Sequence, residues 1–397
     1  MFELEEVATQ EVDMNSTVIK VVGVGGAGGN AVDHMIREGV SGVEFICCNT
    51  DAQALKKSSA HVKLQLGPGL GAGGKPEKAR ELAVLDRERI ADALRGAHMV
   101  FITAGMGGGT GTGAGPVVAE VARDLGILTV AVVTKPFEYE GKRKRLAEEG
   151  VAELAQHVDS LIVILNEKLE EVLGDDVSML EAFKAADNVL RNAVGGIAEI
   201  INVPGLVNVD FEDVKTVMGE MGKAMMGSAQ AAGVDRARVA AEEAVSSPLL
   251  EGIELSGARG VLVNITASTT LGLKEYKEVM ATIRQYTAAE ATVICGAVFD
   301  ETMEDRLRVT VVATGLGGVV AKRKPEMKVI ESYAEMRRTG TDNLPVLDSV
   351  VPQQQFDLGS VMVSARGHTP RNAQAEAMAN SGVDKYDIPA FLRRQSD

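Results

Sequence analysis

The sequence predicts an α/β protein with a doubly wound parallel sheet, a long central helix and a smaller α+β domain. Three observations support this fold class. Apolar runs typical of strands alternate with helical stretches over 17–177, a helical period extends over 178–203, and further strand-like runs follow within 204–315. Alternation of strands and helices is typical of a doubly wound sheet.

The first domain, 17–177, is expected to hold parallel strands covered on both faces. Its strand-like runs are almost continuously apolar, which is the pattern of buried parallel strands. They span 18–24, 43–48, 62–66, 99–104, 128–133 and 161–165. Residues 1–16 precede this domain and are expected to be flexible.

The region 178–203 predicts one long helix that joins two halves of the chain. Phe183, Leu190 and Val194 belong to an apolar series at helical spacing. After this helix we expect further helices near 212–245, and strands at 261–267, 292–299 and 307–313.

The last part of the chain has no sustained apolar period. Mixed charge, Pro and Gln predict a disordered linker over 316–383. The linker leads to a short terminal peptide, 384–397, in which apolar residues precede paired arginines.

Composition excludes several function classes. The chain has 41 Lys and Arg against 56 Asp and Glu, and this net charge of −15 argues against binding to a nucleic-acid backbone. No apolar run is long enough to cross a membrane, and the acidic N-terminus lacks a signal-peptide core. With three cysteines and scattered histidines, we expect a cytoplasmic protein without a disulfide framework or histidine metal site.

The first glycine cluster fits a dinucleotide fingerprint. Gly23, Gly25 and Gly28 form GxGxxG between a strand and a helix, and Asp51 follows the next strand. From these residues alone, the alternatives are an NAD-dependent oxidoreductase and a tight turn that binds nothing. No obvious histidine or lysine constellation for hydride transfer accompanies the fingerprint.

Two further glycine clusters differ in what they predict. Gly69, Gly74 and Lys75 have P-loop spacing, but Pro76 stands where a hydroxyl should hold Mg²⁺, so we expect no P-loop. The run GGGTGTG at 107–113 follows a strand and precedes a helix with Pro116 near its first turn. Its backbone N–H groups and the helix dipole favour an anion, and two such loops suit a polyphosphate.

The run GGGTGTG resembles the signature of the tubulin superfamily. The stretch from about 18 to 314 and the ending DIPAFLRR resemble the FtsZ family of bacterial cell-division GTPases. The resemblance implies a GTP-binding domain at 17–177, a central helix, and a C-terminal polymerisation domain at 204–315. It also implies GTP or GDP with Mg²⁺, self-assembly into head-to-tail filaments, and a ring at the mid-cell division site.

The resemblance also implies which residues contact the nucleotide. The positions that match are Gly25, Gly26, Ala27, Gly28, Gly29, Asn30, Asp51, Gly73, Gly74, Gly107, Gly108, Gly109, Thr110, Gly111, Thr112, Gly113, Glu140, Arg143, Lys144, Asn166, Phe183 and Asp187. Among them, Glu140 would hold the ribose. Either Arg143 or Lys144 would take the role of the family's arginine beside the nucleotide.

The base would lie among Asn166, Phe183 and Asp187. Phe183 and Asp187 are four residues apart, so they share one helix face. An aromatic ring can stack on a purine, and a carboxylate can accept from the N1–H and 2-amino group that guanine offers. The alternative is a core Phe183 and a solvated Asp187.

The acidic segment around Asn208, Asp210 and Asp213 is the candidate for catalysis. The residues alone favour ordinary capping, with Asp210 as N-cap and Asp213 as a first-turn acid. The resemblance implies that this loop acts in trans on the nucleotide of the next subunit. A filament protein that binds GTP without turnover is a further alternative.

The terminal peptide is the candidate for partner binding. The resemblance implies docking onto membrane-tethered division adaptors such as FtsA, without direct insertion into the membrane. The residues concerned are Asp387, Ile388, Pro389, Phe391, Leu392 and Arg393. Pro389 could occupy the first turn of a short helix.

Overall fold

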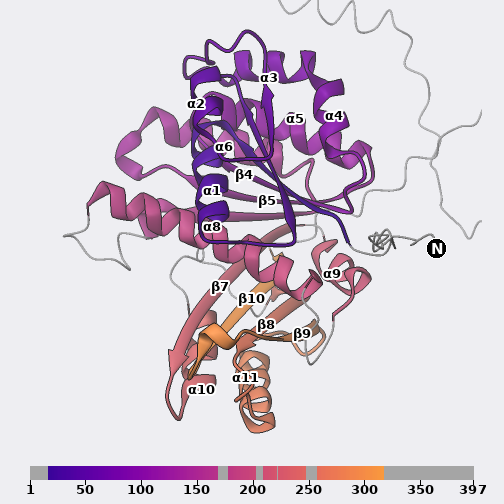
Figure 1. Cartoon of the computed structure of the whole chain (residues 1–397), viewed down its shortest axis with the longest axis vertical. Coiled ribbons are helices and arrows are strands. Elements are labelled where there is room, and N and C mark those ends of the chain that lie inside the picture. The colour runs from indigo at the N-terminus through magenta and orange to yellow at the C-terminus, as the bar shows by residue number, and fades with distance from the viewer. Residues whose placement is uncertain (1–16, 169–177, 203–208, 221, 247–256, 317–397) are drawn as a thin grey trace, which may run out of the picture. The chain divides into compact units, whose positions relative to one another are not determined.

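The structure is a computed structural model that describes residues 17–316 except 169–177, 203–208, 221 and 247–256 (Figure 1). The expected flexible N-terminus 1–16, the terminal peptide 384–397 and all but the first residue of the linker 316–383 lie outside the described residues. The remainder belongs to one of the two units into which the chain divides, Met1–Lys324.

The first half of the sheet is parallel, as predicted. Its strands have the order β3-β2-β1-β4-β5-β6. Their bounds are Ile19–Val24 for β1, Val43–Asn49 for β2, Val62–Gln65 for β3, Met99–Gly105 for β4, Leu128–Lys135 for β5 and Ser160–Leu165 for β6. All six strands fall where the apolar runs place them.

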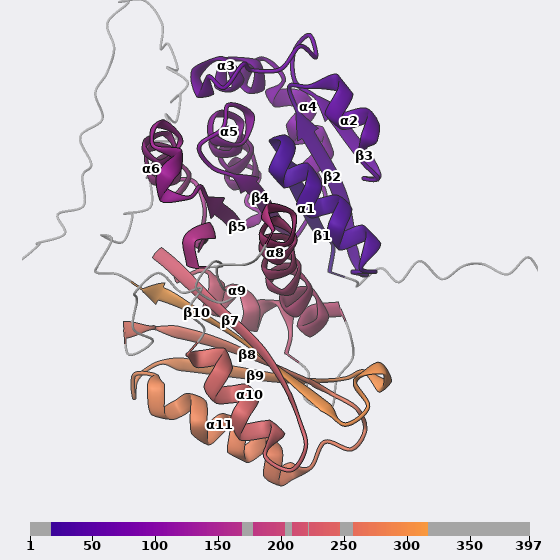
Figure 2. The same cartoon turned by 90° about the vertical axis from the view of Figure 1, so that its left-hand side faces the viewer.

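Helices cover both faces of this half-sheet. They are α1 (Gly25–Arg37), α2 (Ala52–Lys57), α3 (Pro76–Leu85), α4 (Arg87–Leu94), α5 (Thr110–Asp124), the short 3₁₀ helix η1 (Glu138–Glu140), α6 (Lys142–Leu154) and α8 (Met179–Asn202). Val21 of β1 belongs to a core cluster with residues of α1 and α8, whereas Val22 packs with residues of α3 to α6 (Figures 1 and 2). Burial on both faces explains why these strands, apart from the partly exposed edge strand β3, are largely apolar.

The chain after α8 forms the smaller α+β part. Its elements are α9 (Phe211–Met218), β7 (Gly222–Ala232), α10 (Arg236–Val245), β8 (Gly260–Ala267), α11 (Leu273–Tyr286), β9 (Thr292–Phe299), η3 (Glu301–Met303) and β10 (Arg306–Leu316). The strand order is β7-β10-β8-β9, and β7 also pairs with β6, so a ten-stranded sheet results.

Strand β7 corrects part of the prediction of helices near 212–245. Its sequence, GKAMMGSAQAA, is rich in Ala and Met, which favour helices. Tertiary pairing outweighs this local preference, because β7 forms a long antiparallel ladder with β10 and a short parallel one with β6. Helices do occupy the flanking parts as α9 and α10.

The central helix α8 agrees with the prediction for 178–203 to within one residue at each end. Leu190, Val194 and Ile197 are buried against the parallel half of the sheet. Farther along the helix, the Gly196 carbonyl accepts a hydrogen bond from Asn264 on β8, and Glu199 pairs with Arg308 on β10. One helix therefore contacts both parts of the sheet.

Helix α5 begins earlier than the sequence suggests. It starts at Thr110, inside the glycine run, so Pro116 is its seventh residue and lies in the second turn. Proline at this position leaves the Thr112 carbonyl without its helical donor, a cost that is smaller near a helix end. The expectation of Pro116 near the first turn is therefore wrong by about a turn.

Gly227→Ala should destabilise the protein by more than about 2 kcal/mol, because overpacking against rigid backbone is costly. A Cβ at Gly227 would lie 1.7 Å from the Ala244 carbonyl oxygen of α10. Gly195→Ala is the control, since its Cβ would meet only a Val40 methyl at 3.9 Å. Urea unfolding measures both, and equal stability of the two variants would contradict this account of the packing.

Candidate functional site

Two glycine turns meet at the carboxyl edge of the sheet. Strands β1 and β4 are parallel neighbours, and each leads directly into its glycine cluster. A Cβ added to Gly25 would lie 2.9 Å from the Gly111 nitrogen, and one added to Gly111 would lie 2.6 Å from the Gly105 carbonyl oxygen. A side chain at Gly25 would therefore push the two turns apart, and one at Gly111 would distort its own turn against the end of β4. The junction lies where ligands bind in doubly wound sheets.

Both turns present uncapped helix N-termini. Neither α1 nor α5 has a side chain that caps its first turn. The free N–H groups and the positive helix dipoles therefore favour an anion between the turns. Gly107 adopts φ +94°, and its N–H donates to Thr112 Oγ1 at 2.9 Å, which fixes the second turn.

A pocket of about 380 Å³ opens beside these turns. It is lined by residues of α1, the β4 and β5 ends, η1, α6, the end of β6 and α8. The predicted site residues that it brings together are Gly26, Ala27, Asn30, Glu140, Arg143, Asn166, Phe183 and Asp187. Seven lining residues were not predicted from the sequence: Ala104, Gly105, Met106, Thr134, Pro136, Ala186 and Leu190. The first five end or follow predicted strands, which is a signal that could have found them.

The inner part of this pocket holds polar acceptors. Asn166 is only 7% exposed, and its Oδ1 has no hydrogen-bond partner among the described residues. Burial raises the pKa of the Asp187 carboxyl to about 6, while the charges of His34 and Arg37 oppose this rise. Phe183 is 47% exposed and meets Phe137 edge to face. A buried acceptor and a partly buried carboxylate beside an aromatic ring suit a ligand with N–H donors on a flat ring.

The structure distinguishes Arg143 from Lys144. Arg143 pairs with Glu140, and both side chains line the pocket. Lys144 pairs with Glu138 instead and does not line it. Glu140 also accepts from the Phe137 N–H at 3.1 Å, which holds its carboxylate in place.

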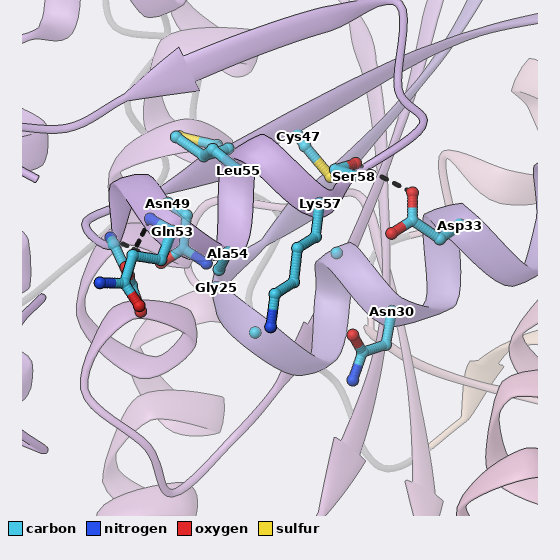
Figure 3. A pocket seen from close by; sticks show the side chains of 14 residues that line it. Gly25, Asn30, Asp33, Cys47, Asn49, Gln53, Ala54, Leu55, Lys57 and Ser58 are labelled. Atoms are coloured by element: carbon cyan, nitrogen blue, oxygen red, sulfur yellow. Dashed lines mark hydrogen bonds between the residues drawn. The ribbon is translucent and has the colours of Figure 1, made fainter.

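A second pocket of about 270 Å³ lies on the other side of the first glycine turn (Figure 3). It shares Gly26 and Asn30 with the larger pocket, and Gly25, Gly29 and Asp51 line it. Asp51 caps α2 by accepting from the Gln53 N–H at 2.8 Å. Ser58 donates to Asp33 at its far wall, as Figure 3 shows.

The remaining phosphate-loop candidates lie close to the second turn. Thr110 shares a hydroxyl hydrogen bond of 2.7 Å with Thr50. A Cβ on Gly109 would lie 3.3 Å from the Gly74 carbonyl carbon, so the loop that holds Gly73 and Gly74 packs against this turn. Residues Gly28 and Gly113 face inward, against the Thr103 and Pro76 carbonyl oxygens respectively.

The acidic segment caps α9, as one of its two interpretations predicts. Asp210 is the N-cap and accepts from the Asp213 N–H at 2.8 Å. Both carboxylates are exposed. Asn208 lies outside the described residues.

These acids lie far from the pocket of their own subunit. The ring of Phe211, the first residue of α9, meets the ring of His98 at 6.1 Å. His98 directly precedes β4, whereas the pocket is at the opposite end of that strand. The seven residues of β4, or roughly 23 Å, therefore separate the start of α9 from the pocket. Neither pocket is lined by a residue of α9 or by its N-cap.

Other classes of site find no support among the described residues. Within these ranges no group of three or more His, Cys, Asp or Glu side chains could hold a metal ion. Nor does any helix in the described part combine the length and apolarity needed to cross a membrane.

The stability of the ligand-free protein should depend on pH through Asp187. A folded-state pKa near 6, above the ordinary 3.8, means that ionisation costs stability as pH rises from about 4 through 6. Asp187→Asn stays neutral and avoids this cost. Its stability relative to the parent should therefore increase from pH 4.5 to pH 7, as urea unfolding can measure, and a difference that does not vary with pH would contradict the assignment.

Comparisons with known proteins identify the family. The description "Tubulin/FtsZ family, GTPase domain" matches residues 18–174, and "FtsZ family, C-terminal domain" matches 222–317. The cell division protein FtsZ of Azotobacter vinelandii is 53% identical over 404 residues, and that of Pseudomonas aeruginosa is 53% identical over 407, each with 100% of both chains covered.

Comparison with solved structures supports the same family. An empty FtsZ dimer from M. jannaschii superposes with a TM-score of 0.73 at 44% identity, over 77% of this chain and 89% of that one. CetZ1 from Haloferax volcanii, a GDP-bound monomer, has a TM-score of 0.66 at 19% identity over 77% and 96% of the two chains, which shows a shared fold. With both family domains present and relatives matched along the whole length, this chain belongs to the FtsZ family of tubulin-like GTPases.

Proposed function

We propose that this GTPase polymerises head to tail and builds the cytokinetic ring of bacterial cell division. One observation carries the proposal. The nucleotide pocket and the acidic start of α9 occupy opposite ends of β4, so no single subunit contains a complete active site. Placing the acids of one copy against the pocket of the next completes the site at each contact.

Such a contact joins two different surfaces of the same molecule. Repetition of a head-to-tail contact that does not close produces a filament. Hydrolysis then depends on assembly, because the pocket without the neighbouring acids binds GTP but lacks the groups that act on water. The relatives named FtsZ are described as cell division proteins, and one solved FtsZ is a dimer, which supports self-association.

The pocket suits guanine. Asp187 would accept from the N1–H and the 2-amino group, with Phe183 against the ring and the Asn166 amide at its edge. The uncapped N–H groups of α1 and α5 would hold the phosphates, and Glu140 the ribose. Arg143 is the better candidate than Lys144 for the cation beside the nucleotide, because only Arg143 lines the pocket.

Mg²⁺ fits this site as an ion that arrives with the nucleotide. The described residues offer no carboxylate cage, and Mg²⁺ in nucleotide sites is held mainly by phosphate oxygens and water. When bound, it would neutralise phosphate charge. The hydroxyls of Thr50 and Thr110, which share a hydrogen bond, and the Asp51 carboxylate beside the first glycine turn are oxygen groups that could orient its water shell.

In the proposed reaction, Asp210 and Asp213 of the neighbouring subunit orient and polarise the water that attacks the γ-phosphate. Asn208 completes this group. The capping bond between Asp210 and the Asp213 N–H supports such a role, because it fixes the loop and leaves the Asp213 carboxylate available.

The sequence alone also allows two alternative functions. A filament protein that binds GTP without turnover predicts no phosphate release. An NAD-dependent oxidoreductase finds no support in the comparisons.

The terminal peptide is proposed to recruit this filament to membrane-tethered adaptors such as FtsA, on the cytoplasmic side at mid-cell. Its apolar residues and paired arginines could fold into a groove on an adaptor. Deletion of 384–397 should abolish binding to adaptor-coated vesicles and leave GTP hydrolysis intact. Equal binding by the truncated protein would place the anchor elsewhere.

Two inactive variants should complement each other. Asp213→Ala removes an acid, and Gly111→Ala would place a Cβ 2.6 Å from the Gly105 carbonyl oxygen and so distort the second glycine turn. Each alone should release almost no phosphate, whereas an equal mixture should recover up to about a quarter of parental activity, the share of contacts that pair an intact pocket with intact acids. The control mixture, Asp213→Ala with Asp210→Ala, should recover nothing. Absence of recovery in a mixture that co-assembles would contradict catalysis in trans.

Asp187→Asn should weaken the preference for guanine and increase the affinity for xanthine. The amide loses one acceptor, so GTP affinity should fall about 10- to 150-fold, the value of a hydrogen bond to a charged group. Xanthosine triphosphate has an oxygen in place of the 2-amino group and should bind this variant more tightly than the parent, because the new amide can donate to it. Competition titrations with GTP, ATP and xanthosine triphosphate measure both changes, and unchanged preference would refute the placement of the base.

A further inference from the structure

The contact between α1 and α8 includes a hydrogen bond between the buried His34 and the exposed Asn188, next to the larger pocket. His34 of α1 is only 8% exposed, and its Nε2 lies 2.7 Å from Oδ1 of Asn188 on α8. Because an amide oxygen only accepts, Nε2 carries the hydrogen and donates it. Asn188 directly follows Asp187, the carboxylate that lines the pocket.

The two helices joined by this bond hold different parts of the ligand site. Helix α1 begins with the glycine turn and lines the pocket through Gly26, Ala27 and Asn30, whereas α8 lines it through Phe183 and Asp187. The hydrogen bond lies in the third turn of α1 and joins residues 154 apart in sequence. It therefore sets the spacing between the phosphate end and the base end of the pocket.

The same histidine also acts on Asp187 through its charge. Burial raises the pKa of the Asp187 carboxyl, and the charges of His34 and Arg37, both on α1, oppose this rise and so favour the ionised form that would accept from guanine. Glu140 and Arg143 line the pocket from η1 and α6, and they are paired with each other. The charged groups that favour the Asp187 carboxylate thus come from α1.

We propose that His34 is a positioning residue for guanine specificity, which holds α8 against α1 through Asn188 and keeps Asp187 in register with the phosphate-binding turns. This inference rests on the proposed binding of GTP in the larger pocket. His34 does not line that pocket, so its effect passes through Asn188 and Asp187.

The test compares GTP and ATP affinities of the full-length protein. His34→Ala should weaken GTP binding about 3- to 10-fold, the value of one lost hydrogen bond, and change ATP binding much less. His34→Gln should restore most of the preference, because its amide nitrogen can reach Asn188 and donate. The control is His61→Ala, which removes an exposed histidine that stacks on Phe45 and should leave the preference unchanged.

Two further measurements separate positioning from a general loss of stability. In His34→Ala, the pH below which GTP binding weakens should move upward, because a charge that favours ionised Asp187 has been removed. His34→Ala and Asn188→Ala should also be non-additive in GTP affinity, since each breaks the same bond. An equal loss of GTP and ATP affinity, an unshifted pH profile or full additivity would overturn the role of His34.

The parent protein distinguishes failure of this inference from failure of the proposed function. If the parent prefers GTP and Asp187→Asn loses that preference while His34→Ala retains it, only the positioning role is wrong. If the parent itself does not prefer GTP to ATP, the proposed guanine site is wrong and the positioning role fails with it.

Discussion

The close approach of two glycine turns, where β1 and β4 end, is the constraint on which the rest of the site depends. A side chain at Gly25 would collide with the backbone of the other turn, and one at Gly111 would collide with the Gly105 carbonyl oxygen at the end of β4. Because the turns touch, two uncapped helix N-termini converge on one place, and the positive ends of both dipoles favour the same anion. The pocket then extends from this point toward α8, which packs on α1 and carries Phe183 and Asp187, the residues proposed to hold the base.

Helix α8 connects the pocket to the second half of the sheet. Its first turns present Phe183 and Asp187 to the pocket, and its later turns carry Gly196 and Glu199, which contact β8 and β10. A displacement of α8 that follows the base would therefore alter contacts with the part of the chain that holds α9. This continuity offers a physical route by which the nucleotide and the acidic surface could influence each other.

The sequence predicted the elements whose local pattern agrees with their burial. Five of the six parallel strands were found because both of their faces are largely covered, whereas the edge strand β3 is partly exposed and was found from its apolar run alone. Helix α8 was found because its apolar side follows a helical period. Strand β7 could not be found, because its alanines and methionines favour a helix and only pairing with β10 and β6 makes it a strand. For the site, the glycine turns were evident from their residues, whereas Asn166, Glu140 and Arg143 depended on family resemblance. The bond between His34 and Asn188 joins distant segments, and no local pattern signals it.

Catalysis between subunits is tested most directly by the rate of phosphate release per subunit as a function of protein concentration. Light scattering, which reports assembly, is followed in the same samples with GTP and Mg²⁺. If the active site is completed only between subunits, the rate per subunit should be near zero at high dilution and rise above a threshold, at the concentration where scattering rises. A rate per subunit that stays constant down to concentrations without any assembly would contradict the account, because it would require a complete active site within one subunit.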